Sequence, residues 1–274
     1  MSRIACIGDN CTDYYDETGE AHFGGNPLNV AVYLRRLGCE ASYLGAVGTD
    51  EFGRQMQRAA AGSGVDLSHL QVVEGSTAVT HVTIRNGERI LGDYDEGVMA
   101  DFALREEDYE FIRQHEFAVS GLWGHCENSL ARIRSGGTRV AFDCADRPDD
   151  PAAVTAARHT DLLFFSDDVR EEKELEEKMA ELYNRMHQGQ ALGQERASSR
   201  LVIATRGEKG SVVYDGTAYE YFGIVPCKVV DTMGAGDSYI AGFISACAEG
   251  APIAECMQRG AECSAVTLGC AGAW

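Results

Sequence analysis

Short apolar segments alternate with amphipathic helical segments along most of this 274-residue chain. The strand-like segments cover residues 3–7, 41–47, 117–120, 139–142, 162–166 and 201–205. The clearest helical segments cover residues 29–37, 51–61, 106–115, 171–188, 236–249 and 253–267. Strands that are separated by helices pair in parallel, and their crossover helices cover both faces of the sheet. The pattern therefore predicts an α/β fold with a central, mostly parallel sheet.

Two polar, strand-like regions interrupt this alternation. Residues 77–84 alternate along the chain, Asn86-Gly87 favours a tight type I′ turn, and residues 88–91 return as a second strand. Residues 11–23 are also short and strand-like. We expect these regions, at about 11–23 and 77–98, to form a small antiparallel layer that we call the lid. The whole chain, residues 1–274, is expected to form one domain into which the lid is inserted.

The charge balance excludes several classes of partner. The net charge is −19, from 24 Lys and Arg against 43 Asp and Glu residues. A nucleic-acid-binding surface needs clustered Lys and Arg to neutralise phosphates, and the chain has no such cluster. An anionic membrane surface would repel the chain for the same reason. We therefore expect no nucleic-acid and no membrane partner.

Targeting and redox signals are also weak. No run of about 18 apolar residues predicts a membrane-spanning helix. Residues 1–13 lack the apolar core of a signal peptide. The ten cysteines contain no C-x-x-C spacing and are expected to be small core residues in a reducing compartment. A cytoplasmic location is the simplest interpretation.

One Gly-rich motif carries the chemistry. Residues 231–238 read Asp-Thr-Met-Gly-Ala-Gly-Asp-Ser and lie between a predicted strand at 228–230 and a helix. The backbone N–H groups of Gly234, Ala235 and Gly236 would open that helix and could converge on an anion. Asp237 would then stand beside this anion hole as a general base. The simpler alternative is a Gly-rich connection whose Asp caps the helix.

The motif resembles the Asp-Thr-x-Gly-Ala-Gly-Asp signature of the ribokinase-like (phosphofructokinase-B type) carbohydrate kinases. Residues 24–31 (Gly-Gly-Asn-Pro-Leu-Asn-Val-Ala), 47–53 and 205–210 resemble further segments of that family, in the family's order. The resemblance covers nearly the whole chain. It implies a ribokinase-like fold with ATP and Mg²⁺ as cofactors and a small-molecule sugar as substrate. It also implies a homodimer that pairs through the lid strands.

The resemblance assigns roles residue by residue. The sugar would be held by residues near the first strand and the Gly-Gly motif: Asp9, Asp13, Gly25 and Asn29. Trp123 lies just past a predicted strand end, where the clefts of α/β folds open, and is a candidate pocket wall. The nucleotide would be held by the loop residues Thr205, Gly207 and Gly210. Some family members bind a monovalent cation, so Asp231 and the carbonyls of residues 265–271 form a candidate K⁺ site.

One segment departs from the family pattern. The family carries Asn-x-x-Glu after a mid-chain strand, where it helps to organise Mg²⁺ and water. Residues 166–172 read Ser-Asp-Asp-Val-Arg-Glu-Glu instead. Asp167, Asp168 or Glu171 could substitute, and the Mg²⁺ site stays unassigned. The departure also keeps open a non-catalytic sugar sensor on a kinase fold.

Within the family, the chain most resembles the fructoselysine 6-kinases. The resemblance lies in residues 7–13, 92–104, 123–125 and 272–274. It implies phosphorylation of the 6-hydroxyl of a fructosamine. Around the substrate's amino-acid tail, Asp93, Asp95 or Glu96 could face an ammonium, and Arg85 or Arg89 a carboxylate. Exposed lid charges without such a role are the alternative, and another ketosamine, a ketose or a nucleoside are the alternative substrates.

Overall fold

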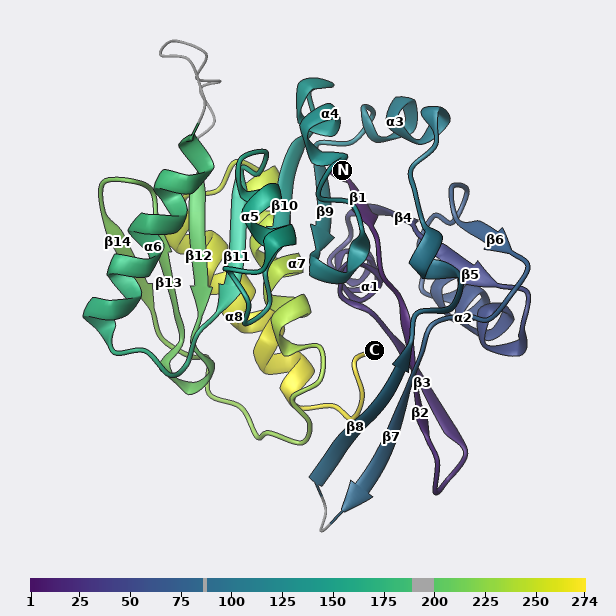
Figure 1. Ribbon diagram of the computed structural model, residues 1–274. Coiled ribbons are helices and arrows are strands. Elements are labelled where there is room, and N and C mark those ends of the chain that lie inside the picture. Colours follow the sequence, from purple (N-terminus) through teal and green to yellow (C-terminus); the bar gives the residue numbers. More distant parts are fainter. Residues whose placement is uncertain (86–87, 189–199) are drawn as a thin grey trace.

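A sheet of eight strands forms the centre of the part of the chain that the structure describes (Figure 1). This computed structural model describes residues 1–85, 88–188 and 200–274, and the side chains of residues 84–91 lie outside that description. The strand order is β14-β13-β12-β11-β10-β9-β1-β4, and all pairs from β12 to β4 are parallel. The pairs β12–β13 and β13–β14 are antiparallel. The strands are β1 (Arg3–Ile7), β4 (Glu40–Leu44), β9 (Phe117–Gly121), β10 (Arg139–Asp143), β11 (Leu162–Ser166), β12 (Leu201–Thr205), β13 (Ser211–Tyr214) and β14 (Tyr219–Phe222).

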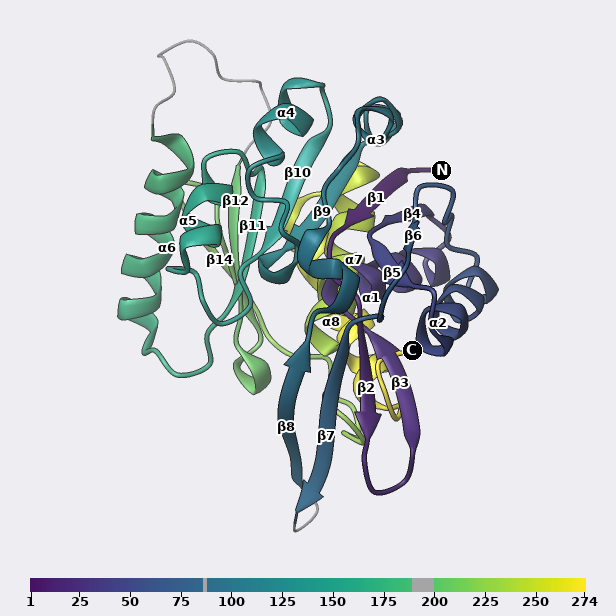
Figure 2. The same ribbon diagram turned by 45° about the vertical axis from the view of Figure 1, so that its right-hand side comes forward.

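Helices cover both faces of this sheet (Figure 2). They are α1 (Asn26–Arg36), α2 (Glu51–Gly62), α3 (Glu106–Ile112), α4 (Leu130–Ser135), α5 (Pro151–Ala157), α6 (Glu172–His187), α7 (Ala235–Ala248) and α8 (Ile253–Leu268). Ile4 of β1 packs in the core with residues of α1, α7 and α8, whereas its neighbour Ala5 packs with residues of α4, α5 and α6. Successive strand side chains point to opposite faces, so one apolar strand supplies two cores.

The lid forms a second, smaller sheet that projects from one end of the body (Figure 1). Its order is β3-β2-β7-β8, from β2 (Cys11–Tyr15), β3 (Glu20–Gly24), β7 (Val79–Arg85) and β8 (Glu88–Asp95). Both hairpins are antiparallel, but β2 and β7 pair in parallel. The expected layer is therefore mixed, because two hairpins from distant parts of the chain meet side by side. The Asn86-Gly87 turn lies outside the described residues.

The predicted strand at 41–47 is divided between two sheets. Its first part is β4, and its second part is β5 (Ala46–Gly48), which pairs with β6 (Gln71–Val73). Gly45 lies at the division, and a Cβ there would be 2.6 Å from the carbonyl oxygen of Gly8. The chain can leave the main sheet at this point only because residue 45 has no side chain.

The predicted strand at 228–230 is wrong. In the structure these residues form no strand, and Val229 and Val230 are each 58% exposed. The N–H of Val230 instead donates to the carbonyl of Leu268 at the end of α8, over 2.7 Å. An apolar run without a neighbouring strand cannot form a sheet ladder.

Three short 3₁₀ turns complete the described elements. They are η1 (Gly97–Asp101), η2 (Leu122–Gly124) and η3 (Gly207–Lys209). Among the described helices, none is both long enough and apolar enough to span a lipid bilayer.

Candidate active site

Two helix N-termini converge on the carboxyl ends of β1 and β10, the two strands that flank β9. Asp9 follows β1, and Asp143 ends β10. Asn26 begins α1, and Asp237 lies in the first turn of α7. Ligand sites of open α/β sheets lie at this edge, because the loops there diverge. The positive ends of both helix dipoles favour negative charge at the same place.

Hydrogen bonds join these groups directly. Nδ2 of Asn26 donates to Oδ1 of Asp237 over 2.7 Å and to Oδ2 of Asp143 over 2.9 Å. Its backbone N–H donates to Oδ2 of Asp9 over 3.1 Å. Nδ2 of Asn29 donates to Oδ2 of Asp237 over 2.6 Å. Both oxygens of Asp237 are therefore held by amides of α1. We call Asp9, Asp143 and Asp237 the carboxylate cluster.

The carboxylate cluster has raised pKa values. Burial raises the pKa of Asp9 to about 6, and the nearby charge of Asp237 adds to the rise. Burial and the charge of Asp237 raise the pKa of Asp143 to about 7. Burial also raises the pKa of Asp237, against the opposing hydrogen bonds from Asn29 and Asn26. Charged forms of neighbouring acids repel one another, so the ionisation of each acid in the cluster depends on the charge of the others.

The Gly-rich motif has the conformation that an open helix start needs. Gly234 is the N-cap of α7 with φ +75°, and a Cβ there would lie 2.5 Å from the hydroxyl of Tyr33. Gly236 is exposed, and a Cβ there would meet nothing within 4 Å. The N–H of Ala235 donates to the carbonyl of Thr232 over 3.3 Å. The N–H groups of Gly236 and Asp237 belong to the first turn, where no intrahelical acceptor exists.

Among the predicted sugar-binding residues, Asp9 belongs to the carboxylate cluster, and Gly25 and Asn29 lie beside it. Gly25 is the N-cap of α1 with φ +101°, and a Cβ there would lie 2.4 Å from Cα of Asn10. Asp9 and Asn29 reach Asp237 or its amide partners, as described above. Asp13 lies on the lid strand β2. Trp123 follows β9 and is 41% exposed.

The predicted nucleotide loop lies at the end of β12. The Thr205 hydroxyl is 2.9 Å from the hydroxyl of Ser166. Gly207 and Gly210 have φ values of +54° and +85°. A Cβ on Gly210 would lie 2.1 Å from the carbonyl oxygen of Phe222, so only glycine fits there. The loop and the carboxylate cluster share one edge of the main sheet.

The substitutes for the missing Asn-x-x-Glu differ in their surroundings. Asp167 is buried, accepts the N–H of Arg170 over 3.0 Å and forms an ion pair with its guanidinium. Asp168 and Glu171 are exposed. Within the described residues, no group of three His, Cys, Asp or Glu side chains has an arrangement that could hold a metal. The side chain of Asp167 therefore stabilises its own loop through these contacts with Arg170.

Asp231 connects two backbone segments. Its Oδ2 accepts the N–H of Gly272 over 2.9 Å, and its Oδ1 accepts the N–H of Met233 over 3.1 Å. The candidate cation residue therefore fixes the Gly-rich motif to the segment that follows α8.

Sequence reasoning did not identify three residues of this site. Asn26 donates to Asp237, and Asp143 accepts from the same amide nitrogen of Asn26. The indole Nε1–H of Trp274 donates to Oδ1 of Asn29 over 2.6 Å. Asp143 ends an apolar strand at the functional edge, and that position was the available signal. Trp274 lies in the segment 272–274 that carries part of the resemblance, but nothing in the sequence indicated its contact with Asn29, which joins distant parts of the chain.

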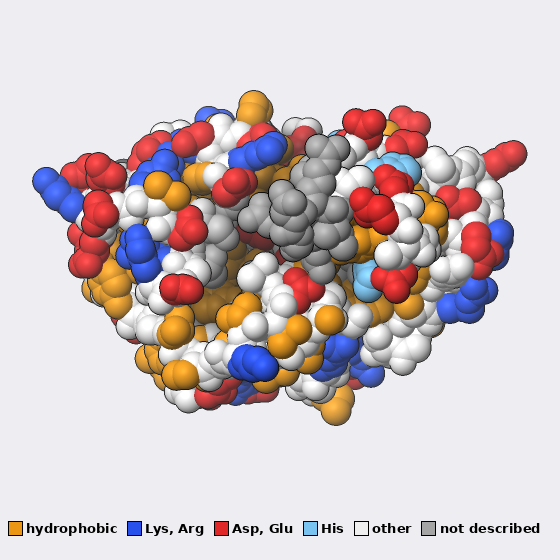
Figure 3. Space-filling model, turned by 90° about the horizontal axis from the view of Figure 1, so that it is seen from below, with side chains coloured by type: hydrophobic (Ala, Val, Ile, Leu, Met, Phe, Trp, Pro, Cys, Tyr) orange, Lys and Arg blue, Asp and Glu red, His pale blue; other side chains and the backbone are white. Residues whose placement is uncertain are grey.

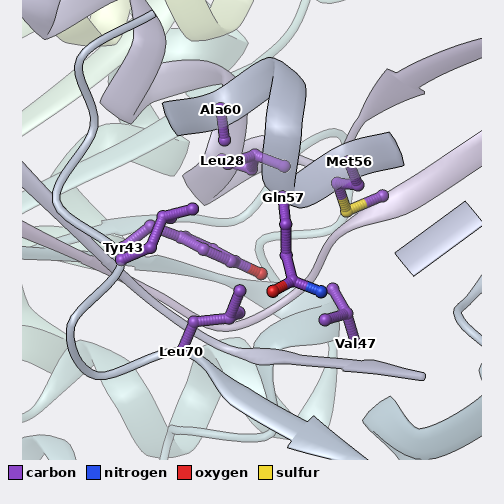
Figure 4. Close-up of a pocket in the computed structure, with 8 residues that line it drawn as sticks. Leu28, Tyr43, Val47, Met56, Gln57, Ala60 and Leu70 are labelled. Carbon is purple, nitrogen blue, oxygen red and sulfur yellow. The ribbon is translucent and has the colours of Figure 1, made fainter. Parts of the chain in front are cut away.

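The surface near the lid is hollowed. Figure 3 looks at the lid end and shows a hollow lined by hydrophobic side chains, with acidic side chains around it. A separate small pocket between α1 and α2 is almost entirely apolar and has no room for a water molecule (Figure 4). Leu28, Tyr43, Met56 and Leu70 are among its lining residues, and it contains no carboxylate. This pocket is a packing gap and not the site.

The comparisons with known proteins agree with the geometry. Residues 2–274 match the model of the pfkB family carbohydrate kinases. The chain is 39% identical over 274 residues to a fructoselysine 6-kinase of Shigella flexneri. This match covers 100% of this chain and 100% of the relative. It is 30% identical over 278 positions to a fructosamine kinase of Bacillus subtilis, covering 99% of this chain and 93% of the relative.

The solved structures bear on the fold. A ribokinase of Arabidopsis thaliana, complexed with ribose and ATP, superposes with a TM-score of 0.87 at 20% identity. The superposition covers 99% of this chain and 93% of that one. The predicted ribokinase-like fold and the predicted family are both confirmed. The chain belongs to the pfkB family of carbohydrate kinases.

Proposed function

We propose that this chain is an ATP-dependent kinase for the 6-hydroxyl of a fructosamine, with fructoselysine as its best substrate. The observation that carries the proposal is Asp237, whose two oxygens are held by Asn26 and Asn29 beside the open first turn of α7. Relatives that are named a fructoselysine 6-kinase and a fructosamine kinase support the substrate class. Another ketosamine, a ketose or a nucleoside remains the alternative substrate.

In the proposed reaction, Asp237 accepts the proton of the 6-hydroxyl as its oxygen attacks the γ-phosphorus of ATP. A new O–P bond forms, the bond to the β–γ bridging oxygen breaks, and that electron pair leaves with ADP. The N–H groups of Gly236 and Asp237 donate to the phosphoryl oxygens as charge develops. Gly234 and Ala235 give the turn its shape.

The same proposal assigns the binding groups. Thr205, Gly207 and Gly210 would follow the phosphates and ribose of ATP. Mg²⁺ supplies charge neutralisation at the β- and γ-phosphates when it is bound. The described residues contain no group of three side chains arranged to hold a metal, which fits Mg²⁺ held mainly by phosphate oxygens and water. Asp231 with the carbonyls of residues 265–271 is the proposed K⁺ site, and K⁺ dependence of kcat tests it.

The sugar would lie between the lid and the carboxylate cluster. Asp13 would accept hydrogen bonds from its hydroxyls, Gly25 would let it approach the backbone, and Trp123 would form a wall. Oδ1 of Asp9 is buried and accepts no hydrogen bond within the described part of the protein, so it can receive a substrate donor.

We propose two further roles for the lid: it binds the amino-acid tail of the substrate, and it pairs two protomers. Asp93 and Asp95 are exposed, and Glu96 contacts His125 over 3.2 Å. Arg85 and Arg89 have side chains outside the described residues. Strands β3 and β8 form the two edges of the lid sheet, and such edges can pair with a second copy. We infer a cytoplasmic homodimer, and sedimentation equilibrium tests its oligomeric state.

The experiment that tests the function measures ADP formation from ATP and Mg²⁺. Fructoselysine is compared with other fructosamines, fructose, ribose and a nucleoside. We expect fructoselysine to exceed the other sugars at least about tenfold in kcat/KM, a ratio that differential contacts can supply. Preference for a free sugar would reassign the substrate. Tight sugar binding without any turnover would overturn the kinase proposal in favour of a sugar sensor.

A further inference from the structure

The amide of Asn29 lies between two groups of opposite hydrogen-bonding character. Its Oδ1 accepts the indole Nε1–H of Trp274, and its Nδ2 donates to Oδ2 of Asp237, each over 2.6 Å. An indole N–H can only donate, and an ionised carboxylate can only accept. The two partners therefore permit only one orientation of the Asn29 amide.

The other orientation of the amide would be unfavourable. It would direct Oδ1 of Asn29 at Oδ2 of Asp237 and Nδ2 at the indole N–H of Trp274. Both hydrogen bonds would be lost in a buried place, because Asn29 is only 6% exposed. We propose that Trp274 is a positioning residue, which orients Asp237 for the reaction through Asn29. This inference rests on the proposed role of Asp237 as the general base.

Trp274 is itself held by the segment that precedes it. The Tyr33 hydroxyl donates to the carbonyl of Ala273, and the N–H of Gly272 donates to Asp231. Gly272 and Ala273 are buried, and a Cβ on Gly234 would lie 3.2 Å from Cα of Ala273. Trp274 is therefore anchored to the same turn that presents Asp237.

The proposal predicts a direction for the pKa of Asp237. The hydrogen bond from Asn29 favours the ionised carboxylate and opposes the rise that burial causes. If the Asn29 amide loses its orientation, the pKa of Asp237 rises further. The other groups that face Asp237 are Asn26, Asp9, Asp143 and Tyr33, and His125 lies near Asp9. None of them is altered by a change at residue 274.

The test is Trp274→Phe, which keeps an aromatic ring and removes the N–H donor. We expect kcat to fall about tenfold, as for one lost hydrogen bond to the partner of a charged group, with KM values within about twofold. The acid limb of the kcat/KM profile should move to higher pH. The unfolding midpoint of the variant is measured in parallel, and Trp274→Ala separates loss of the donor from loss of ring packing.

A double-mutant cycle tests whether Trp274 acts through Asn29. If it does, the Asn29→Ala and Asn29→Ala/Trp274→Phe variants have the same kcat and pH profile, so the two changes are not additive. Additive effects would overturn the inference. So would a Trp274→Phe variant with the wild-type rate and pH profile.

If Trp274→Phe unfolds, Asn29→Ala alone must show the upward shift of the acid limb, and its absence counts against the proposal. Failure of the inference is distinguishable from failure of the proposed function. The Asp237→Asn variant would remain nearly inactive in the first case and would retain its rate in the second.

Discussion

Asp143 and Asp237 accept hydrogen bonds from the same nitrogen atom, Nδ2 of Asn26, over 2.9 and 2.7 Å. Asp143 ends strand β10, and Asp237 lies in the first turn of helix α7. Sharing one amide brings both charges close together, so the protonation of each acid depends on the other. Substituting one acid should therefore shift the pKa of the other, and a pH profile can measure that shift.

Asp237→Asn should lower kcat by about 10²–10⁴-fold, because a positioned base is lost while its shape remains. The KM values for ATP and sugar should change little, since the amide can keep a hydrogen bond to the α1 side chains. Steady-state kinetics and thermal unfolding check both points. A variant with a near-normal rate would show that another group takes the proton.

Asp143→Asn should move the acid limb of the kcat/KM profile to lower pH. The substitution removes a negative charge beside Asp237, and a like charge disfavours ionisation. The amide oxygen of residue 143 can still accept from Asn26, but the amide nitrogen cannot accept the N–H of Ala145 as Oδ1 of Asp143 does. A pH profile between about 5 and 9 checks the shift. Asp146→Asn, an exposed position on the following loop, is the matched control and should leave the limb in place.

Asp143→Asn should also raise the stability of the unliganded protein, relative to the wild type, as the pH increases. The folded-state pKa of Asp143 is about 7, above its ordinary 3.8, so the folded protein binds this proton more tightly than the unfolded chain. The resulting stability is complete below about pH 4 and is lost as the pH rises to about 7. The variant cannot ionise, so its unfolding midpoint relative to that of the wild type should rise by a few degrees between pH 4 and pH 8. A difference between the two midpoints that is the same at both pH values would contradict the raised pKa.

Gly234→Ala and Gly236→Ala should differ, although both lie in one motif. At Gly234 the backbone has φ +75° and a Cβ would lie 2.5 Å from the Tyr33 hydroxyl, so alanine should cost roughly 1–2 kcal/mol or more. At Gly236 a Cβ meets nothing within 4 Å, so alanine should leave the unfolding midpoint unchanged or higher.

Activity separates structural tolerance from function at Gly236. A methyl group there would occupy space beside the N–H groups that are proposed to hold the phosphoryl oxygens. We therefore expect the Gly236→Ala protein to fold normally while kcat falls at least about tenfold. Normal folding together with a normal rate would remove Gly236 from the anion hole.

Much of the fold could be predicted from the sequence. The boundaries of β1, β11 and β12 follow directly from short apolar runs and the residues that bound them. Strand and helix periodicity is a local property, so it survives in the sequence whatever the chain contacts later. The exposed valines at 229 and 230 mark its limit. A run of β-branched residues forms a strand only where a neighbouring strand offers hydrogen bonds.

The sequence alone also determined that a helix begins at the Gly-rich motif, because Gly234 can adopt a positive φ and Asp237 follows it in the first helical turn. Only the tertiary structure decided which groups surround Asp237. Asn26 donates to it, Asp143 shares the amide of Asn26, and Trp274 is connected to it through Asn29. These three residues come from different parts of the chain. Such contacts depend on how β10, α1 and the residues after α8 pack together, and packing between distant segments leaves no periodicity in the sequence.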